Sequence, residues 1–229
     1  MASKSRALTI GLFLFDDNTE LDWAGPFEVF GMWARDFPHE VKILTFSQRS
    51  EVITCNKHLK VHVDHVGFDT LPQLDVLVYP GGPGTRGQLG REDIREFVRE
   101  MHERGTLMAS VCTGFIVVCQ CLAGSLVFAD SGLLDNRAAT THWRSLELLG
   151  KLGTNVKVRS LDARYVDSGN VVTSAGVSAG IDMSLYLIAK LHSVARARHV
   201  QKAMEYYPES QPPSWDPDSL HYKPPRAKL

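Results

Sequence analysis

The stretch GTLMASVCTG, residues 105–114, places one cysteine where an apolar strand ends and a long apolar run, 115–128, begins. We predict that this run is helical, so that Cys112 lies at a strand-to-helix turn. A helix start carries unpaired backbone N–H groups and a partial positive charge, which favour a thiolate over a thiol. Two interpretations are open from this stretch alone. Cys112 is a nucleophile, or it is a small buried hydrophobic side chain.

Segments of strand type and helix type alternate on both sides of this turn. The pattern predicts strands at 8–15, 41–46, 74–79, 105–109 and 171–174, an edge hairpin at 52–54 and 59–63, short extended runs at 156–158 and 164–166, and helices at 23–30, 91–104, 142–152, 181–192 and onward to about 206. Because strands alternate with helices, we expect an α/β fold with a mostly parallel sheet and helices on both faces. Sites in such folds lie at the carboxyl ends of the strands.

Length and composition indicate one domain without a charged binding surface. The chain has 229 residues, 44% of them hydrophobic, and residues 1–206 are predicted to form a single domain. Residues 207–229 are rich in proline and charge and are expected to form a surface arm. The 25 basic and 26 acidic residues are scattered, so the sequence predicts no binding of nucleic acid or of an anionic membrane. No apolar segment is long enough to span a bilayer.

Several residues of ligand-binding type are expected to bind nothing. The four cysteines lack the spacing of a disulfide framework, which favours a reducing, cytoplasmic setting. Cys119 and Cys121 have no histidines at ligand spacing, so a metal site is not expected. Cys55 falls in the predicted hairpin and is expected to be inert. Gly176 and Gly180 do not have the spacing of a phosphate loop, and close packing explains them better.

Other polar and glycine positions have a structural interpretation beside a functional one. Asp22 directly precedes the 23–30 helix and, from position alone, is its N-cap. Gly81 and Gly82 follow a strand, where turn residues with positive φ are common. His142 opens a helix and is expected to make a structural polar contact, so we leave it outside the catalytic set.

Five segments, taken in order, resemble the ThiJ/PfpI superfamily, and within it they are most similar to isocyanide hydratases. They are ELDWAGP (20–26), PGG (80–82), SVCTG (110–114), ATTHW (139–143) and AGVSAGID (175–182). Sensory domains of some transcription regulators and other thiol hydrolases of the superfamily carry similar segments. The resemblance implies a flavodoxin-like three-layer sandwich, a homodimer and a cysteine nucleophile on a strained elbow.

The resemblance also implies roles for individual residues. Cys112 would be the nucleophile, and Asp22 would hold the thiolate and supply a proton. Thr113, with Gly82 of the Gly81-Gly82 loop, would stabilise charge at the reacting centre. Two negative charges in contact are unfavourable, so we expect the Asp22 carboxyl to keep its proton beside the thiolate.

The implied activity is the hydration of a small isocyanide to an N-substituted formamide through a thioimidate, without a metal or an organic cofactor. Two alternatives stay open. One is a non-catalytic ligand or redox sensor with the same fold. The other is a different thiol hydrolase or aldehyde-handling enzyme, in which His142 would take part.

The chain departs from the superfamily directly after the elbow. Joining Gly114 to Ser125 would restore the expected spacing, so residues 115–124, FIVVCQCLAG, are ten extra residues. They resemble the segment that follows them, which suggests an imperfect duplication or an engineered insertion. Ten residues fall about 80° short of three helical turns. We expect the first copy to take the helix position and push 125–130 outward; the alternative is a longer helix kinked near Gly124.

Overall fold

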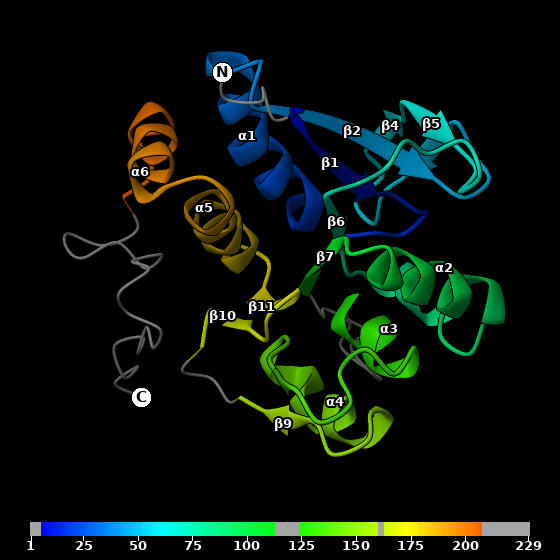
Figure 1. Cartoon of the computed structure of the whole chain (residues 1–229). Helices are drawn as coiled ribbons and strands as arrows, with labels where there is room; N and C mark the ends of the chain where they lie inside the picture. Colours follow the sequence, from blue (N-terminus) through cyan, green and yellow to red (C-terminus); the bar gives the residue numbers. More distant parts are fainter. Residues whose placement is uncertain (1–5, 113–123, 160–162, 208–229) are drawn as a thin grey trace.

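The fold is built on a central sheet of seven strands in the order β10-β11-β7-β6-β1-β2-β5 (Figure 1). The structure is a computed structural model that describes residues 6–112, 124–159 and 163–207. The strands are β1 Leu8–Phe13, β2 Val41–Ser47, β5 His65–Val66, β6 Val76–Tyr79, β7 Leu107–Cys112, β10 Tyr165–Asp167 and β11 Val171–Gly176. All neighbours run parallel except β10 and β11. The predicted mostly parallel sheet is confirmed.

Helices cover both faces of this sheet (Figure 1). One layer holds α1 Glu20–Asp36, α5 Ala179–Leu191 and α6 Val194–Ala203, and the other holds α2 Glu92–Glu103, α3 Gly124–Asp130 and α4 Leu146–Leu152. Each layer encloses its own cluster of buried apolar side chains against the sheet. The flavodoxin-like three-layer sandwich expected from the sequence is therefore confirmed.

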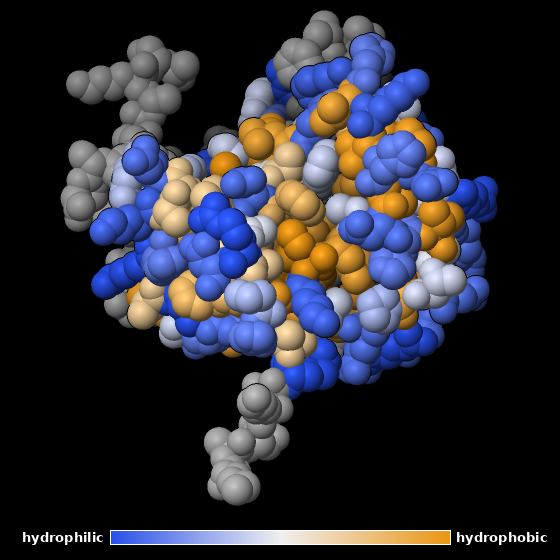
Figure 2. Space-filling model, turned by 90° about the horizontal axis from the view of Figure 1, so that it is seen from above, coloured by the Kyte–Doolittle hydropathy of each residue, from blue (hydrophilic) through white to orange (hydrophobic). Residues whose placement is uncertain are grey.

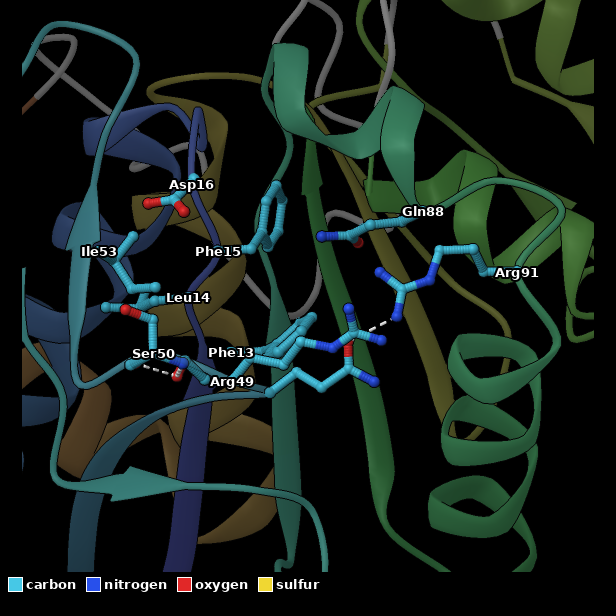
Figure 3. A pocket seen from close by; sticks show the side chains of 11 residues that line it. Phe13, Leu14, Phe15, Asp16, Arg49, Ser50, Ile53, Gln88 and Arg91 are labelled. Carbon is cyan, nitrogen blue, oxygen red and sulfur yellow. Dashed lines mark hydrogen bonds between the residues drawn. The ribbon is translucent and has the colours of Figure 1, made fainter.

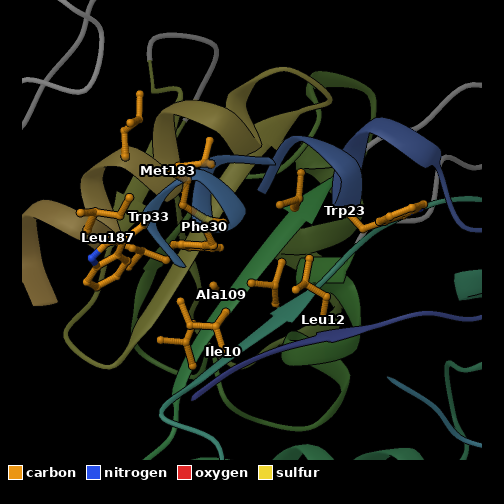
Figure 4. Packing of buried hydrophobic residues seen from close by; sticks show 14 of the residues in the cluster. Ile10, Leu12, Trp23, Phe30, Trp33, Ala109, Met183 and Leu187 are labelled. Atoms are coloured by element: carbon orange, nitrogen blue, oxygen red, sulfur yellow. The ribbon is translucent and has the colours of Figure 1, made fainter. Parts of the chain in front are cut away.

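Strand β1 is buried on both faces, which explains why its sequence is continuously apolar rather than alternating. Ile10 and Leu12 belong to the cluster that also contains Phe30 of α1 (Figure 4). Phe13 points to the opposite layer, where its ring lies 6.0 Å from that of Phe97 in α2. Since successive strand side chains alternate between faces, one short strand serves both halves of the core.

The smaller elements lie at the periphery. Strands β3 Val52–Thr54 and β4 Lys60–His62 form the predicted antiparallel hairpin, and β8 Ala138–Ala139 pairs with β9 Lys157–Val158. Single 3₁₀ turns, η1 Pro83–Gly87 and η2 Trp143–Ser145, precede α2 and α4. Among the described residues, no helix has the length and apolar character needed to cross a membrane.

The helix after the elbow differs from the expectation. Residues 113–123, which include nine of the ten residues that we predict to be extra, lie outside the described part of the chain, and α3 begins at Gly124. Ser125 to Ala129 are buried, and the Phe128 ring lies 5.8 Å from that of Tyr79. The prediction that 125–130 would be pushed outward is wrong, because this second copy occupies the core.

The side chains of the second copy explain this outcome. Ser125 donates a buried 2.7 Å hydrogen bond to Thr141, and Asp130 forms a 2.7 Å ion pair with Arg95. Ten residues earlier, the corresponding positions of the first copy hold a phenylalanine and a glutamine, which cannot supply this pair of contacts. An unpartnered buried polar group is unfavourable. The hydroxyl of Thr141 and the charge of Arg95 therefore favour the second copy in this position.

Candidate active site

The predicted site residues come from three segments at one edge of the sheet. Asp22 lies in the first turn of α1, after β1, and Gly81 and Gly82 lie in the loop after β6. Cys112 is the last residue of β7, and its backbone is in register with Gly176 of β11. The Cys112 side chain and all of Thr113 lie outside the described residues. The backbone thus brings these segments to the carboxyl ends of neighbouring parallel strands, as expected.

Asp22 is fully buried and links two of the segments. Its Oδ2 accepts a 3.0 Å hydrogen bond from the backbone N–H of Gly81. The interpretation of Asp22 as an N-cap is wrong, because α1 begins at Glu20 and Thr19 occupies the cap position. Asp22 therefore lies inside the first helical turn and makes this hydrogen bond to another loop rather than to its own helix.

Gly82 allows the loop after β6 to approach the loop after β1. Its φ is 134°, and a Cβ on it would lie 2.5 Å from the Asp17 carbonyl oxygen and 2.6 Å from the Thr19 nitrogen. Next to it, the Thr19 N–H donates a 2.9 Å hydrogen bond to the Gly81 carbonyl. The structural interpretation of Gly82 as a positive-φ turn residue is confirmed. Its contribution to charge stabilisation stays a prediction.

We expect Gly82→Ala to destabilise the protein and weaken the site. The new side chain meets two backbone atoms and an unfavourable φ, which together cost about 2 kcal/mol or more. The melting temperature should fall by about 5 °C or more, measured by differential scanning calorimetry. Gly87→Ala is the matched control, because nothing lies within 4 Å of its Cβ position and its φ is not positive. Equal melting temperatures for the two variants would contradict this account of Gly82.

Two contacts around the elbow were not predicted from the sequence. The buried Ser125 hydroxyl donates to Thr141 Oγ1, and Thr140 N–H donates 2.9 Å to Thr173 Oγ1. Together they join α3, the ATTHW segment and β11. Thr140 and Thr141 belong to the ATTHW segment, but nothing in the local spacing indicates that they would reach Thr173 and Ser125. Tertiary packing alone reveals their role.

Gly180, in the first turn of α5, packs closely against its neighbours, as predicted, whereas close packing at Gly176 stays a prediction. A Cβ on Gly180 would lie 3.0 Å from Val111, in the strand that leads to Cys112, and 3.3 Å from Pro26 of α1. Gly180 thus allows the N-terminal turn of α5 to lie directly against β7. This contact fixes the strand that carries the elbow from the side opposite α3.

His142 and Cys55 have structural surroundings. His142 precedes η2, and its Nδ1 accepts a 3.3 Å hydrogen bond from Arg144 N–H. Burial, with a smaller effect of the Arg144 charge, lowers the pKa of His142, so the ring is neutral at pH 7. Cys55 is buried, and burial raises the pKa of its thiol. Neither group therefore carries charge at neutral pH.

No cluster of three or more histidine, cysteine or acidic side chains suited to a metal ion occurs within the described residues. Cys119 and Cys121 lie outside them.

Comparison with known proteins identifies the fold family. Residues 9–190 match the model of the DJ-1/PfpI family, which is more than half of the chain. The chain belongs to the DJ-1/PfpI family. The match extends from the first strand of the sheet to the end of α5, and so includes every segment of the candidate site.

Curated proteins of different kinds resemble this chain. It is 33% identical over 213 residues to an isonitrile hydratase from Pseudomonas putida, which covers 93% of this chain and 85% of that protein. It is 27% identical over 189 residues to the HTH-type transcriptional regulator GbdR from Pseudomonas aeruginosa, covering 80% of this chain but 47% of the regulator. The relatives of this chain thus include both a named enzyme and a named regulator.

Solved structures agree with the family assignment. The crystal structure of a ThiJ/PfpI family protein from Pseudomonas syringae has a TM-score of 0.74 and 28% identity, covering 90% of this chain and 77% of that one. DJ-1 from Schizosaccharomyces pombe has a TM-score of 0.69 at 19% identity, covering 90% of this chain and all of that one, which shows the shared fold alone.

Proposed function

We propose that this DJ-1/PfpI protein hydrates isocyanides to N-substituted formamides, with Cys112 as the nucleophile. The observation that carries the proposal is the fully buried Asp22, whose carboxylate is held by Gly81 at the sheet edge where β7 delivers Cys112. The resemblance to an isonitrile hydratase, another name for the same activity, supports it. An isocyanide carbon is electrophilic enough for addition of a thiolate.

The first step forms the covalent intermediate. The Cys112 thiolate adds to the terminal carbon of the isocyanide, and an S–C bond forms. The Asp22 carboxyl gives its proton to the same carbon, which yields a thioimidate and an Asp22 carboxylate. Thr113 and the Gly82 backbone would stabilise the charge that develops during the addition.

The second half of the reaction restores the enzyme. A water molecule adds across the C=N bond of the thioimidate: its oxygen, with one hydrogen, bonds to carbon, and its second hydrogen goes to nitrogen as a proton. The C–S bond then breaks, the Cys112 thiolate leaves, and the hydroxyl proton passes to Asp22. The product is the formamide, and both side chains regain their starting states. The cycle consumes one water and one isocyanide and needs no redox partner.

Asp22→Asn tests the proposed proton donor. We expect turnover of cyclohexyl isocyanide to fall about a hundredfold or more, mainly in kcat, because general acid catalysis contributes factors of this size. The asparagine oxygen can still accept from Gly81 N–H, so the loop keeps its anchor. Formamide appearance by chromatography is the measurement. Glu20→Gln, in the same helical turn, is the matched control and should retain turnover, since Glu20 pairs with Lys57.

The proposal fails if the unaltered protein produces no formamide from any alkyl isocyanide tested. The alternative, a ligand or redox sensor, draws support from the similarity to the regulator GbdR. That alternative predicts that Cys112 is modified by ligand or oxidant without turnover. Intact-mass spectrometry of the protein after incubation distinguishes the two.

The proposal includes a homodimer in a reducing, cytoplasmic setting. Leu21 in the first turn of α1 is 42% exposed and Leu59 near the β3–β4 hairpin is 50% exposed. Lys57 and Glu20 join these two elements through a 2.9 Å ion pair. On the face seen in Figure 2, hydrophilic residues lie between and over the hydrophobic ones. Light scattering tests the homodimer, because it measures the mass of the protein in solution, and we expect the mass of two chains.

A further inference from the structure

A cavity lies at the carboxyl ends of β1 and β2 (Figure 3). Its volume is about 160 Å³. The lining residues come from the end of β1, the loop after β2, the β3 strand and the segment between η1 and α2. None of Asp22, Gly81 and Gly82 lines it. The cavity is therefore not explained by the proposed reaction.

One part of the cavity wall is apolar. Phe13, Phe15 and Ile53 line it, and all three are buried. A cavity of roughly 150 Å³ lined by apolar side chains accommodates a molecule the size of benzene. The volume and the lining therefore suit one ring or a branched chain of about six carbons.

The opposite wall carries an unused hydrogen-bond donor. Gln88 is only 6% exposed, and its Oε1 accepts a hydrogen bond from the hydroxyl of Tyr79. Burial raises the pKa of Tyr79 well above its ordinary value, so the hydroxyl stays protonated and can donate. With Oε1 turned toward Tyr79, Nε2 of Gln88 faces the cavity (Figure 3). No described residue accepts a hydrogen bond from Nε2.

Two guanidinium groups line the same cavity as this amide. Arg91 uses Nε and Nη2 to bind Asp93 and Gln48, and no hydrogen bond of its Nη1 occurs among the described residues. Arg49 lies 3.6 Å from the same Asp93 carboxylate and is largely exposed. The Arg91 and Gln48 hydrogen bonds lower the pKa of Asp93 to about 2, so it carries one negative charge against two positive ones. The wall keeps an excess of positive charge.

A second carboxylate lies on the far side. Asp16 lines the cavity across from Gln88 and Arg91, and its Oδ1 accepts a 2.8 Å hydrogen bond from Thr54 N–H (Figure 3). Its charge disfavours an anion on that side. An anionic ligand is therefore directed with its charged end toward the guanidinium groups and its body along the phenylalanines.

We propose that this cavity binds a small monocarboxylate with an apolar body of about six carbons. The carboxylate receives hydrogen bonds from Gln88 Nε2 and from the Arg91 and Arg49 guanidinium groups. Planar guanidinium groups match carboxylate geometry, and charge-assisted hydrogen bonds of this kind are strong. The body packs on Phe13 and Phe15. This inference does not depend on the proposed hydration reaction.

The test is a titration of the full chain with benzoate, followed by ligand-observed NMR. We expect saturable binding at millimolar concentration or below, and binding of the neutral isostere benzamide at least about tenfold weaker. Gln88→Glu should weaken benzoate binding at least about tenfold, because it keeps an acceptor for Tyr79 but replaces the donor with a negative charge. Asp22→Asn should leave benzoate binding unchanged, which separates this site from the proposed active site.

Controls make the outcome decisive. Arg198→Gln lowers the net charge of the protein by one, as Gln88→Glu does, but at an exposed position on α6. It should leave benzoate binding unchanged. If Gln88→Glu does not fold, Arg49→Gln replaces it, because Arg49 is exposed and its loss should weaken binding at least about threefold. Absence of saturable benzoate binding, equal affinity for benzamide, or unchanged binding in the folded cavity variant would each overturn the proposal.

Discussion

Replacing Cys112 with alanine is expected to lower isocyanide turnover at least about a thousandfold. Removal of a catalytic nucleophile leaves only binding and charge stabilisation, and enzymes with covalent mechanisms lose activity on this scale or more. The thioimidate also requires the sulfur atom, so it cannot form in this variant. Formamide production under saturating cyclohexyl isocyanide measures the first effect. Rapid-quench mass spectrometry measures the second, as an added mass equal to that of the isocyanide.

Cys55→Ala is the matched control for this experiment. Cys55 is buried, and burial raises the pKa of its thiol, so it is not expected to react. The control variant should retain turnover and still give the covalent adduct. If Cys112→Ala keeps more than about a tenth of the activity of the unaltered protein, the covalent mechanism is wrong.

The second large effect concerns the ten extra residues. A variant lacking residues 114–123 joins Thr113 directly to Gly124 and has the same sequence as one lacking 115–124. We expect it to fold and to be at least as active as the unaltered protein. The reason lies at the strand–helix junction, where the Val111 carbonyl oxygen lies 3.1 Å from the Cβ position of Gly124. Two residues, Cys112 and Thr113, suffice to span this distance.

Closing a shorter connection also costs less conformational entropy. By the length dependence of loop closure, the variant gains about 1 kcal/mol in free energy of unfolding. Its melting temperature should rise by about 2–4 °C, measured by calorimetry. A further change of the remaining junction glycine to alanine should remove this gain, because a Cβ there meets the Tyr79 carbonyl oxygen at 2.5 Å. A shortened chain that fails to fold would contradict the assignment of the 125–130 segment to the core.

Much of this fold was predictable because its strands are buried on both faces. Continuous apolar runs such as that of β1 are easily distinguished from the amphipathic pattern of α2, and their alternation predicts the layers. The position of α3 was not predictable in the same way. The two copies have similar apolar patterns, and the choice between them depends on Thr141 and Arg95, which are distant in sequence.

The candidate site was predictable in its residues but not in its geometry. Thr19 and Asp22 are both residue types that cap helices, so the sequence alone did not show where α1 begins. The structure starts α1 at Glu20 with Thr19 at the cap position, and the Asp22 carboxyl instead accepts from the backbone N–H of Gly81 in another loop. The sequence shows which chemical groups the candidate site contains, whereas the contact of Asp22 with Gly81 depends on how two distant loops meet at the edge of the sheet.

The close approach of Val111 to Gly124 has a use in protein engineering. Two chain positions thirteen apart in sequence lie next to one another on either side of the segment that begins with Cys112, so a foreign domain with neighbouring termini can be spliced between them. Such a graft would report on events at the cysteine, because any ligand that tightens the junction changes the anchor points of the inserted reporter. Residues 112–123 separate the two positions, so a biosensor cassette would replace most of the segment that we predict to be extra.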